Sequence, residues 1–369
     1  MNKYVKALLY ILAIFISILL ASPFISLSLP KKYANRAYYR LIYRVIVEKE
    51  TAGCRTNEET ADKIFQYISN HEFAMGTPFE CKPVESLIYA QAYCDFQART
   101  LNELLGIAGI FSRYDMLLDK SGISPHTLNE VFLHGKWCVF DPAMNIIFKD
   151  KSGKMLSLDE ISANPGLILN SKKLIALKEY DQPEYSVREK WYCELFPMPL
   201  PPIRSKPVIL KYHIFDYMID AYFKIFKYNF SDFYQDLYLK FNKCGLREAD
   251  LILFFKARNY HLCYRDDLAF KYYNLLLKQF PDSKYAKDAI LFKGMLYFDT
   301  GDFHKAIEAF NLAIEKDPGW SKVANFYLGR AYANLGDDQA SLEAYSKTFI
   351  LNLSDRILEE LNKRGLKKH

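Results

Sequence analysis

Three side chains that together could perform acyl transfer occur in chain order within residues 93–142: the thiol of Cys94, the imidazole of His126 and the carboxylate of Asp141. A cysteine nucleophile needs a neighbouring base that holds it as a thiolate, and the base needs a third group that orients it. Cys94 is therefore the candidate nucleophile, His126 the candidate base and Asp141 the candidate orienting group. Each also has a structural interpretation, because a single buried cysteine is most often a small core residue.

The segment that carries Cys94 is expected to be helical. Small and apolar side chains recur at helical spacing over residues 94–108, and Gly109 is suited to ending a helix. If Cys94 begins this helix, the positive end of the helix dipole favours a thiolate at that position. The apolar run at 84–91 offers an alternative, in which it forms an earlier part of the same helix and Cys94 lies in the middle.

Residues 126–141 predict a β-hairpin, because two runs rich in β-branched and aromatic residues flank Gly135. With a two-residue turn at 134–135 the numbers of paired residues sum to 269, and with a turn at 135–136 they sum to 271. Either register places His126 and Asp141 on one face of the ribbon, since side chains alternate along a strand. A three-residue turn would place them on opposite faces unless a bulge restored the phase.

These residues resemble the transglutaminase-like domain, a branch of the papain-like cysteine enzymes. The elements that carry the resemblance are Cys94-Asp95, a leucine-rich helix from Ala98 to Leu105, Gly109-Ile110 with Arg113, His126, Glu130-Val131, Gly135 with Trp137, and Asp141-Pro142. The resemblance implies an α+β fold with a papain-like core, in which the nucleophile helix packs on antiparallel strands. It also implies Cys94 as nucleophile, His126 as base and Asp141 as orienting group.

Two positions depart from the family pattern, because Tyr93 and Ser112 stand where a glycine and an alanine are common. Gln91 is a candidate oxyanion donor, as a glutamine upstream of the nucleophile is in papain-like enzymes. Its spacing from Cys94 is shorter than in that family, which favours the alternative of a glutamine on a helix surface.

Composition narrows the function classes. The chain has 369 residues, of which 50% are hydrophobic, and this is enough for two or three domains. Its net charge of +6 is not typical of a nucleic-acid-binding protein. Two His–Cys neighbour pairs, His134 with Cys138 and His261 with Cys263, lack further ligands at zinc spacing. We therefore expect no metal, no cofactor and no nucleic-acid partner.

Residues 1–30 predict an uncleaved, single-pass membrane anchor. No charged residue falls between Lys6 and Lys31, and this stretch is long enough to span a hydrocarbon core of about 30 Å. Lys3 and Lys6 also fit the basic start of a cleaved signal peptide. Five basic residues within 31–44 favour a cytoplasmic body, whereas a signal anchor with a short basic tail favours the other side, so the side of the membrane stays open.

Between the anchor and the C-terminal third we expect a transglutaminase-like domain at 31–175 and a linker at 176–245. Thr56 and Glu59 predict a capped helix that carries the apolar spacing from Ala61 to Ile68. The proline-rich segment 196–202 indicates a linker or an extended segment wrapped on the protein. Residues 212–241 predict an amphipathic helix rich in aromatic residues, which packs between domains or lies on a membrane surface.

Residues 246–369 contain an internal repeat that resembles tetratricopeptide arrays. The middle unit has the characteristic small residues, aromatics and closing proline at Gly294, Tyr297, Gly301, Ala306, Phe310, Ala313 and Pro318. The pattern recurs 35 residues later, from Gly329 to Thr348, and a weaker unit ends upstream at Pro281. About three repeats result, near the minimum for a stable stack. The resemblance implies binding of peptides or partner proteins in a concave groove, and a spacer or dimer surface is the alternative.

Together these features predict a membrane-anchored, cysteine-dependent acyl-transfer enzyme that acts on amide bonds of a protein or peptide and carries a partner-binding repeat domain. Water as acceptor would make it a peptidase or amidase, and an amine as acceptor would make it a crosslinking transglutaminase. The alternative is a non-catalytic scaffold that binds partner proteins through its repeats, since a fold does not by itself fix a function.

Overall fold

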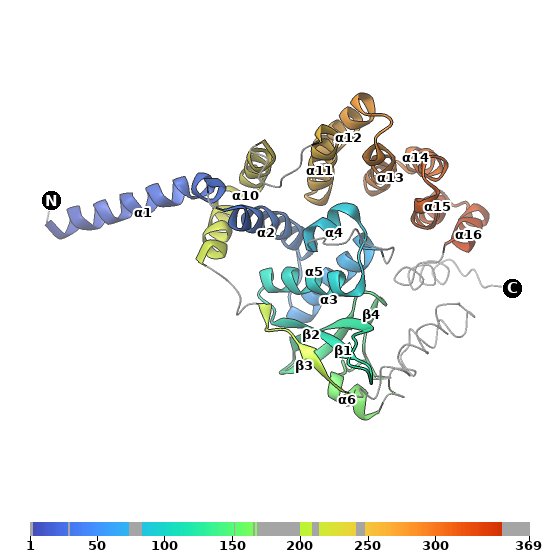
Figure 1. Cartoon of the computed structure of the whole chain (residues 1–369), viewed down its shortest axis with the longest axis horizontal. Coiled ribbons are helices and arrows are strands. Elements are labelled where there is room, and N and C mark those ends of the chain that lie inside the picture. Colours follow the sequence, from blue (N-terminus) through green and yellow to red (C-terminus); the bar gives the residue numbers. More distant parts are fainter. Residues whose placement is uncertain are drawn as a thin grey trace.

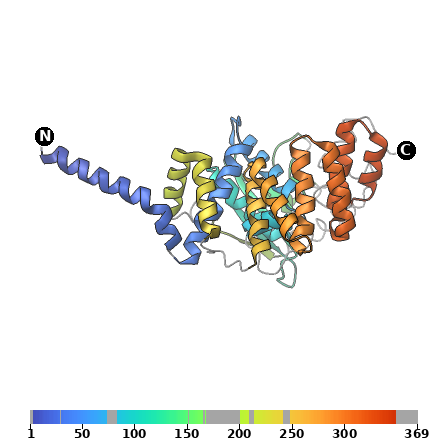
Figure 2. The ribbon, with the colours of Figure 1, turned by 90° about the horizontal axis from the view of Figure 1, so that it is seen from above.

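A computed structural model of the chain describes residues 3–28, 30–73, 83–150, 152–164, 167, 200–208, 214–240 and 248–348. Within these residues the fold is mixed α/β, with one five-stranded antiparallel sheet and a C-terminal row of paired helices. Figure 1 shows helices lying over the sheet and the paired helices arching beyond them. Figure 2 shows the same row of helices from above.

Helices α1 (Lys3–Ser28) and α2 (Lys31–Glu50) come first, and α1 projects from the body of the protein (Figures 1 and 2). None of the helices in the described part of the chain is both long enough and apolar enough to cross a membrane. The predicted anchor at residues 1–30 is therefore not confirmed. Helix α3 (Asn57–His71) begins as predicted, because the Thr56 side chain accepts a hydrogen bond from the backbone N–H of Glu59 at 3.1 Å.

Cys94 is the first residue of helix α5 (Cys94–Ile107), and the preceding helix α4 (Pro83–Tyr89) is separate from it. The alternative of one continuous helix is therefore wrong. The break falls at Ala90, whose φ of 53° lies in the left-handed region and cannot continue a helix. Gly109 follows the other end of α5 with a φ of 82°, as expected for a glycine that ends a helix.

The sheet contains β1 (Ser112–Leu118), β2 (His126–Leu133), β3 (Lys136–Asp141), β4 (Ile146–Ile147) and β5 (Leu200–Arg204), in the order β4-β3-β2-β1-β5. Asn129 pairs with Phe140, and Leu133 pairs with Lys136, so paired residue numbers sum to 269. This confirms the register with a two-residue turn at His134 and Gly135. Both turn residues have positive φ, as the tight turns that suit twisted strands require.

Helix α5 packs against the strands β1 and β2. The side-chain amide of Asn129 donates to the carbonyl oxygen of Ala98 at 2.8 Å, and the hydroxyl of Ser112 donates to the side-chain oxygen of Asn102 at 2.8 Å. A helix on antiparallel strands was the arrangement expected around Cys94. A short helix α6 (Leu158–Ala163), opened by a capping box at Ser157, follows β4 in the chain.

The region predicted as a linker is described at 200–208 and 214–240, and its remaining residues lie outside the described part. Residues 200–204 form β5, an extended edge strand that tolerates consecutive prolines. Helix α10 (Ile214–Lys240) packs on α2 through two forked ion pairs, Arg36 with Asp216 and Arg40 with Asp220. The predicted amphipathic helix thus packs within the protein along α2.

The C-terminal helices form three consecutive antiparallel pairs: α11 (Ala249–Leu262) with α12 (Asp266–Gln279), α13 (Lys284–Asp299) with α14 (Phe303–Lys316), and α15 (Ser321–Leu335) with α16 (Asp338–Ser346). A Cβ at Gly294 would lie 2.8 Å from the Phe310 ring, and one at Gly329 would lie 2.5 Å from the Tyr345 ring. The predicted pairing of small residues with aromatics is confirmed, because the glycines make room for the rings.

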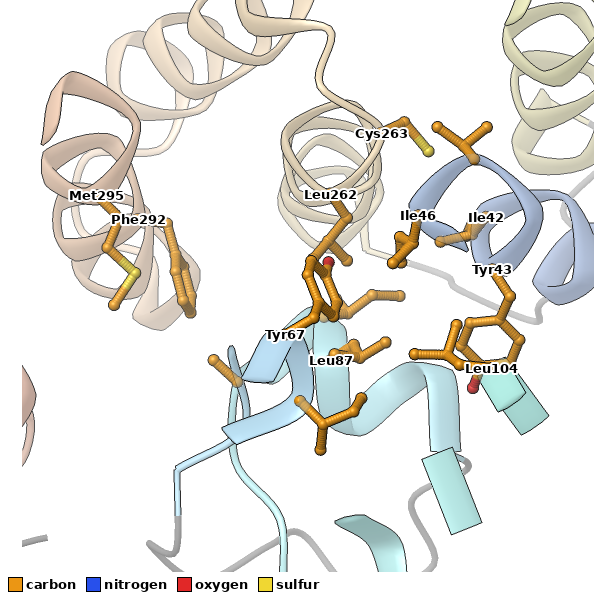
Figure 3. Close-up of a cluster of buried hydrophobic side chains, with 14 of the residues drawn as sticks. Ile42, Tyr43, Ile46, Tyr67, Leu87, Leu104, Leu262, Cys263, Phe292 and Met295 are labelled. Atoms are coloured by element: carbon orange, nitrogen blue, oxygen red, sulfur yellow. The ribbon is translucent and has the colours of Figure 1, made fainter. Parts of the chain in front are cut away.

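A continuous hydrophobic core joins the regions predicted as separate domains. It runs without interruption from the N-terminal helices into the repeat helices. Figure 3 shows one part of it, where side chains from α2, α3, α4, α11 and α13 meet; these are Ile42, Ile46, Tyr67, Leu87, Leu262, Phe292 and Met295. The repeat helices therefore belong to the same packed body as the helices that lead to Cys94.

Candidate functional site

His126 and Asp141 form a buried pair at the ends of neighbouring strands. The Nε2 atom of His126 lies 2.7 Å from Oδ2 of Asp141, and the two residues are 1% and 0% exposed. The other carboxylate oxygen, Oδ1, accepts the backbone N–H of Met144 at 3.2 Å. Because both carboxylate oxygens are held, Asp141 fixes the orientation of the imidazole. Nδ1 is the ring nitrogen of His126 that Asp141 does not contact.

Cys94 is a partly exposed free cysteine, and it lies close enough to His126 to help raise the pKa of the imidazole. Burial lowers the pKa of His126, but the charge and hydrogen bond of Asp141, with a smaller contribution from the neighbouring Cys94, outweigh burial and raise that pKa to about 10. The contact with Asp141 thus favours the protonated imidazole. The three residues singled out in the sequence lie together, with the thiol at a helix start and the other two on adjacent strands.

Gln91 lies in the short connection between α4 and α5, not on a helix surface as one interpretation expected. Its backbone N–H donates to the carbonyl oxygen of Ser86 at 3.1 Å, and the residue forms a parallel bridge with Phe73. These contacts fix its backbone. Its role as an oxyanion donor stays a prediction.

A buried polar cluster around Glu72 supports the start of α5, and sequence reasoning missed it. Oε1 of Glu72 accepts hydrogen bonds from the hydroxyls of Ser86 at 2.5 Å and Thr100 at 3.0 Å, and its carbonyl oxygen accepts the Gln97 side chain at 2.8 Å. Burial raises the pKa of Glu72 to about 8, against the two hydroxyl bonds that lower it. This neutral acid ties together α3, α4 and α5. The only signal in the sequence is polar residues at otherwise apolar positions.

Several residues of the transglutaminase-like pattern form a second buried cluster. Both Nε and Nη2 of Arg113 donate to Oε2 of Glu130, and the guanidinium lies over the Trp137 ring, 4.2 Å from its centroid. Asp115 is fully buried beside them, and burial with the neighbouring Glu130 raises its pKa to about 8. Arg113 thus contacts both Glu130 and Trp137 across the sheet.

Two arginines from outside the sheet region hold the ends of α4 and α5. Arg44 on α2 donates to the carbonyl oxygen of Ile107, the last residue of α5, at 2.9 Å. Arg258 on α11 donates to the carbonyl oxygens of Leu87 and Ile88, near the end of α4, at 2.9 and 2.8 Å. Cationic side chains commonly satisfy the free carbonyls at helix C-termini.

The histidines of the two His–Cys neighbour pairs each contact a carboxylate. His134 pairs with Glu58 at 2.8 Å, and His261 pairs with Asp299 at 3.4 Å. Across the described residues, no group of three or more His, Cys, Asp or Glu side chains is arranged to hold a metal ion.

Residues 288–319 match the tetratricopeptide repeat family. The match spans most of α13 and all of α14, where the sequence pattern is strongest. Comparison with curated proteins found no match to this chain. The C-terminal region therefore contains a tetratricopeptide repeat, and stacks of such repeats form surfaces that bind partner proteins.

Proposed function

We propose that the protein is a cysteine-dependent acyl-transfer enzyme with a papain-like core, acting on amide bonds of a protein or peptide. The observation that carries this proposal is the His126 imidazole, which binds Asp141 through Nε2 and lies close enough to Cys94 for that residue to contribute to its raised pKa. A structural cysteine needs no such partner. A nucleophile needs both a base and a group that orients the base.

In the first half of the reaction the Cys94 sulfur, as thiolate, attacks the carbonyl carbon of the amide and forms a C–S bond. The carbonyl oxygen becomes an oxyanion in the tetrahedral intermediate. As this collapses, the C–N bond breaks, and the His126 imidazolium gives its proton to the departing nitrogen. The products are a free amine and a thioester on Cys94, and the Asp141 carboxylate keeps the ring in place.

In the second half an acceptor attacks the thioester carbonyl. Water or an amine supplies the nucleophile, His126 takes up its proton, and the C–S bond breaks to release the Cys94 thiolate. With water the product is a carboxylic acid, as in a peptidase or amidase. With an amine it is a new amide bond, as in a transglutaminase.

The developing oxyanion needs hydrogen-bond donors. The first backbone N–H groups of a helix have no partner within the helix, and Cys94 occupies the first position of α5. Its own N–H is therefore our first candidate donor, because such donors stabilise the charge that appears in the transition state. Gln91, in the connection before α5, is the second.

The test uses a peptide that carries a chloroketone in place of its scissile amide. We expect intact mass spectrometry to show one covalent adduct, and peptide mapping to place it on Cys94. Cys94→Ala should abolish labelling, and His126→Ala should slow it strongly. Cys54, a second partly exposed free cysteine, is the control within the same molecule. Labelling of Cys54 and Cys94 at equal rates would count against the enzyme.

The second candidate function is a partner-binding scaffold, which the tetratricopeptide match at 288–319 favours. On this proposal the repeats carry the function and Cys94 is not used. Partner binding would then survive Cys94→Ala unchanged, and no substrate would form a thioester on the protein. A hydroxylamine-sensitive adduct on Cys94 after incubation with peptide amides would decide for the enzyme.

A further inference from the structure

A cavity of about 290 Å³ opens between α3 and the repeat helices α11, α13 and α15. Tyr67 from α3, Leu262 from α11 and Met295 from α13 are among its walls. Figure 3 shows the Tyr67 hydroxyl directed toward Leu262. Neither Cys94 nor His126 lines the cavity, so it is separate from the proposed acyl-transfer site.

The fixed charges around the cavity favour a cation. Three carboxylates line it, those of Glu50, Asp266 and Asp299, against one guanidinium, that of Arg258. Arg258 is 2% exposed and binds two backbone carbonyls of α4, whereas the Asp299 side chain is 52% exposed. An entering ligand therefore meets negative charge at the surface of the cavity.

Two imidazoles line the cavity, those of His71 and His261, and both ring nitrogens of His261 already have partners, Nδ1 with Arg258 and Tyr273 and Nε2 with Asp299. Burial lowers the pKa of His71 to about 4 and also lowers the pKa of His261, which favours the neutral form of both rings. Nδ1 of His71 lies 2.9 Å from the carbonyl oxygen of Tyr67, which can only accept. Nδ1 therefore carries the proton, and Nε2 is an acceptor.

Two polar atoms in the α3 wall are left without a partner. The Tyr67 hydroxyl and the side-chain oxygen of Asn70 are buried and have no hydrogen-bond partner among the described residues. Both residues line the cavity. Such atoms are rare in folded proteins because each costs about 1–3 kcal/mol. A ligand rich in donors, or water that it orders, would supply the missing hydrogen bonds.

We propose that this cavity binds a lysine side chain of a partner protein. An ammonium group has three donors and no acceptor, which matches a wall of acceptors and carboxylates. Tyr264 and Tyr327 also line the cavity, and aromatic rings favour a desolvated cation. The volume of about 290 Å³ lies just below the range of about 300–1,000 Å³ for ligand sites, which suits a single side chain.

The occupant is assigned to a protein because the repeat helices supply much of the wall. Met295 and Asp299 belong to α13, inside the segment that matches the tetratricopeptide repeat. Repeats of this kind present surfaces to other proteins. The proposal goes beyond the acyl-transfer reaction and does not require it, so Cys94→Ala protein should bind the same ligand equally well.

The test titrates the full-length protein with a fluorescent, end-capped nonapeptide of Gly and Ser that has one central lysine. A second peptide has norleucine in place of lysine, which keeps the stem and removes the ammonium. We expect the lysine peptide to bind at least about tenfold more tightly than the norleucine peptide, because only the lysine ammonium can make charged hydrogen bonds. Equal binding of the two peptides would overturn the proposal. Butylamine binding as tightly as the lysine peptide would overturn the assignment to a partner protein.

Variants locate the site. Asp299→Asn should weaken binding of the lysine peptide about tenfold, whereas Glu308→Gln, an exposed carboxylate on α14 outside the cavity, should not change it. Tyr67→Phe should weaken binding about fivefold and also stabilise the free protein, since it removes a buried hydroxyl without a partner. Tyr260→Phe, a buried tyrosine that does not line the cavity, is the matched control. Unchanged affinity in both Asp299→Asn and Tyr67→Phe would contradict the proposal.

Discussion

The guanidinium of Arg258, on the first repeat helix, donates from Nε to the carbonyl oxygen of Ile88 at 2.8 Å. Its Nη2 donates to the carbonyl oxygen of Leu87 at 2.9 Å, and its plane lies over the Phe292 ring, 3.9 Å from the centroid. A residue of the repeat region thus holds the end of α4, the helix that precedes the candidate nucleophile.

From the end of α4 a chain of backbone hydrogen bonds continues toward Cys94. The N–H of Ala90 donates to Leu87, the N–H of Phe73 donates to Ala90, and the N–H of Ala92 donates to Phe73. Ala92 lies two residues before Cys94. The position of the thiol therefore depends on contacts between segments that are far apart in the sequence.

Arg258→Lys should destabilise the protein by about 2–4 kcal/mol, because a lysine cannot bridge both buried carbonyls in the same geometry. Urea unfolding measures the change. Arg330→Lys is the matched control, since that arginine lies over the Phe298 ring from a half-buried position on α15. We also expect slower alkylation of Cys94 in the folded Arg258→Lys protein. A free energy of unfolding equal to that of the wild type would show that the contact contributes little.

Asp141→Asn keeps a side chain of the same shape beside His126 but removes the charge that raises its pKa. Without that charge the burial of His126 prevails, so its pKa should fall from about 10 toward or below the ordinary value of 6.5. An NMR titration of the imidazole protons measures this. Asp119→Asn, just after the end of β1, should leave the titration unchanged. A pKa still near 10 in Asp141→Asn would contradict the role given to this carboxylate.

Glu72 makes stability depend on pH in the unusual direction for a carboxylate. Its pKa is raised in the folded protein from 4.5 to about 8, so the folded state holds a proton that the unfolded state loses. The contribution of Glu72 to the free energy of unfolding is fully present below pH 4.5. It is lost as the pH rises toward 8, at up to about 1.4 kcal/mol per pH unit. Glu72→Gln should flatten this slope in urea unfolding at pH 5, 6, 7 and 8. An unchanged slope would mean that Glu72 is already ionised at pH 5.

Gly294→Ala should destabilise the repeat region by about 1–3 kcal/mol, because the added methyl would lie 2.8 Å from the buried Phe310 ring. The double variant Gly294→Ala with Phe310→Leu tests the cause. If the clash is responsible, the cost of the alanine should shrink when the ring is gone. Thermal unfolding followed by circular dichroism measures both. Additive effects of the two substitutions would point to another cause.

Local patterns predicted the hairpin well. The turn at His134 and Gly135 and the alternation of side chains suffice to place His126 and Asp141 on one face, and the observed register has that consequence. The paired helices of the repeat region were also predictable, because Gly294 with Phe310 and Gly329 with Tyr345 repeat at fixed spacing.

The start of α5 could not be decided in the same way. Residues 84–91 have an apolar pattern that could continue into the next helix. The break at Ala90 is fixed by tertiary contacts, because Phe73 binds the carbonyl oxygen of Ala90 and Arg258 binds the carbonyl oxygens just before it. The Glu72 cluster and the cavity between α3 and the repeat helices were missed for the same reason. Each is assembled from segments whose proximity is a property of the packed core, which no local pattern records.

The most direct test of the account compares Cys94 with Cys54 inside one molecule. Both are free and half-buried, so access alone does not separate them. We predict that iodoacetamide at pH 6.5 alkylates Cys94 at least about tenfold faster than Cys54, because the proposed reaction requires His126 to activate the Cys94 sulfur. The difference should disappear in His126→Ala. Equal rates in the wild-type protein would contradict the claim that His126 activates Cys94.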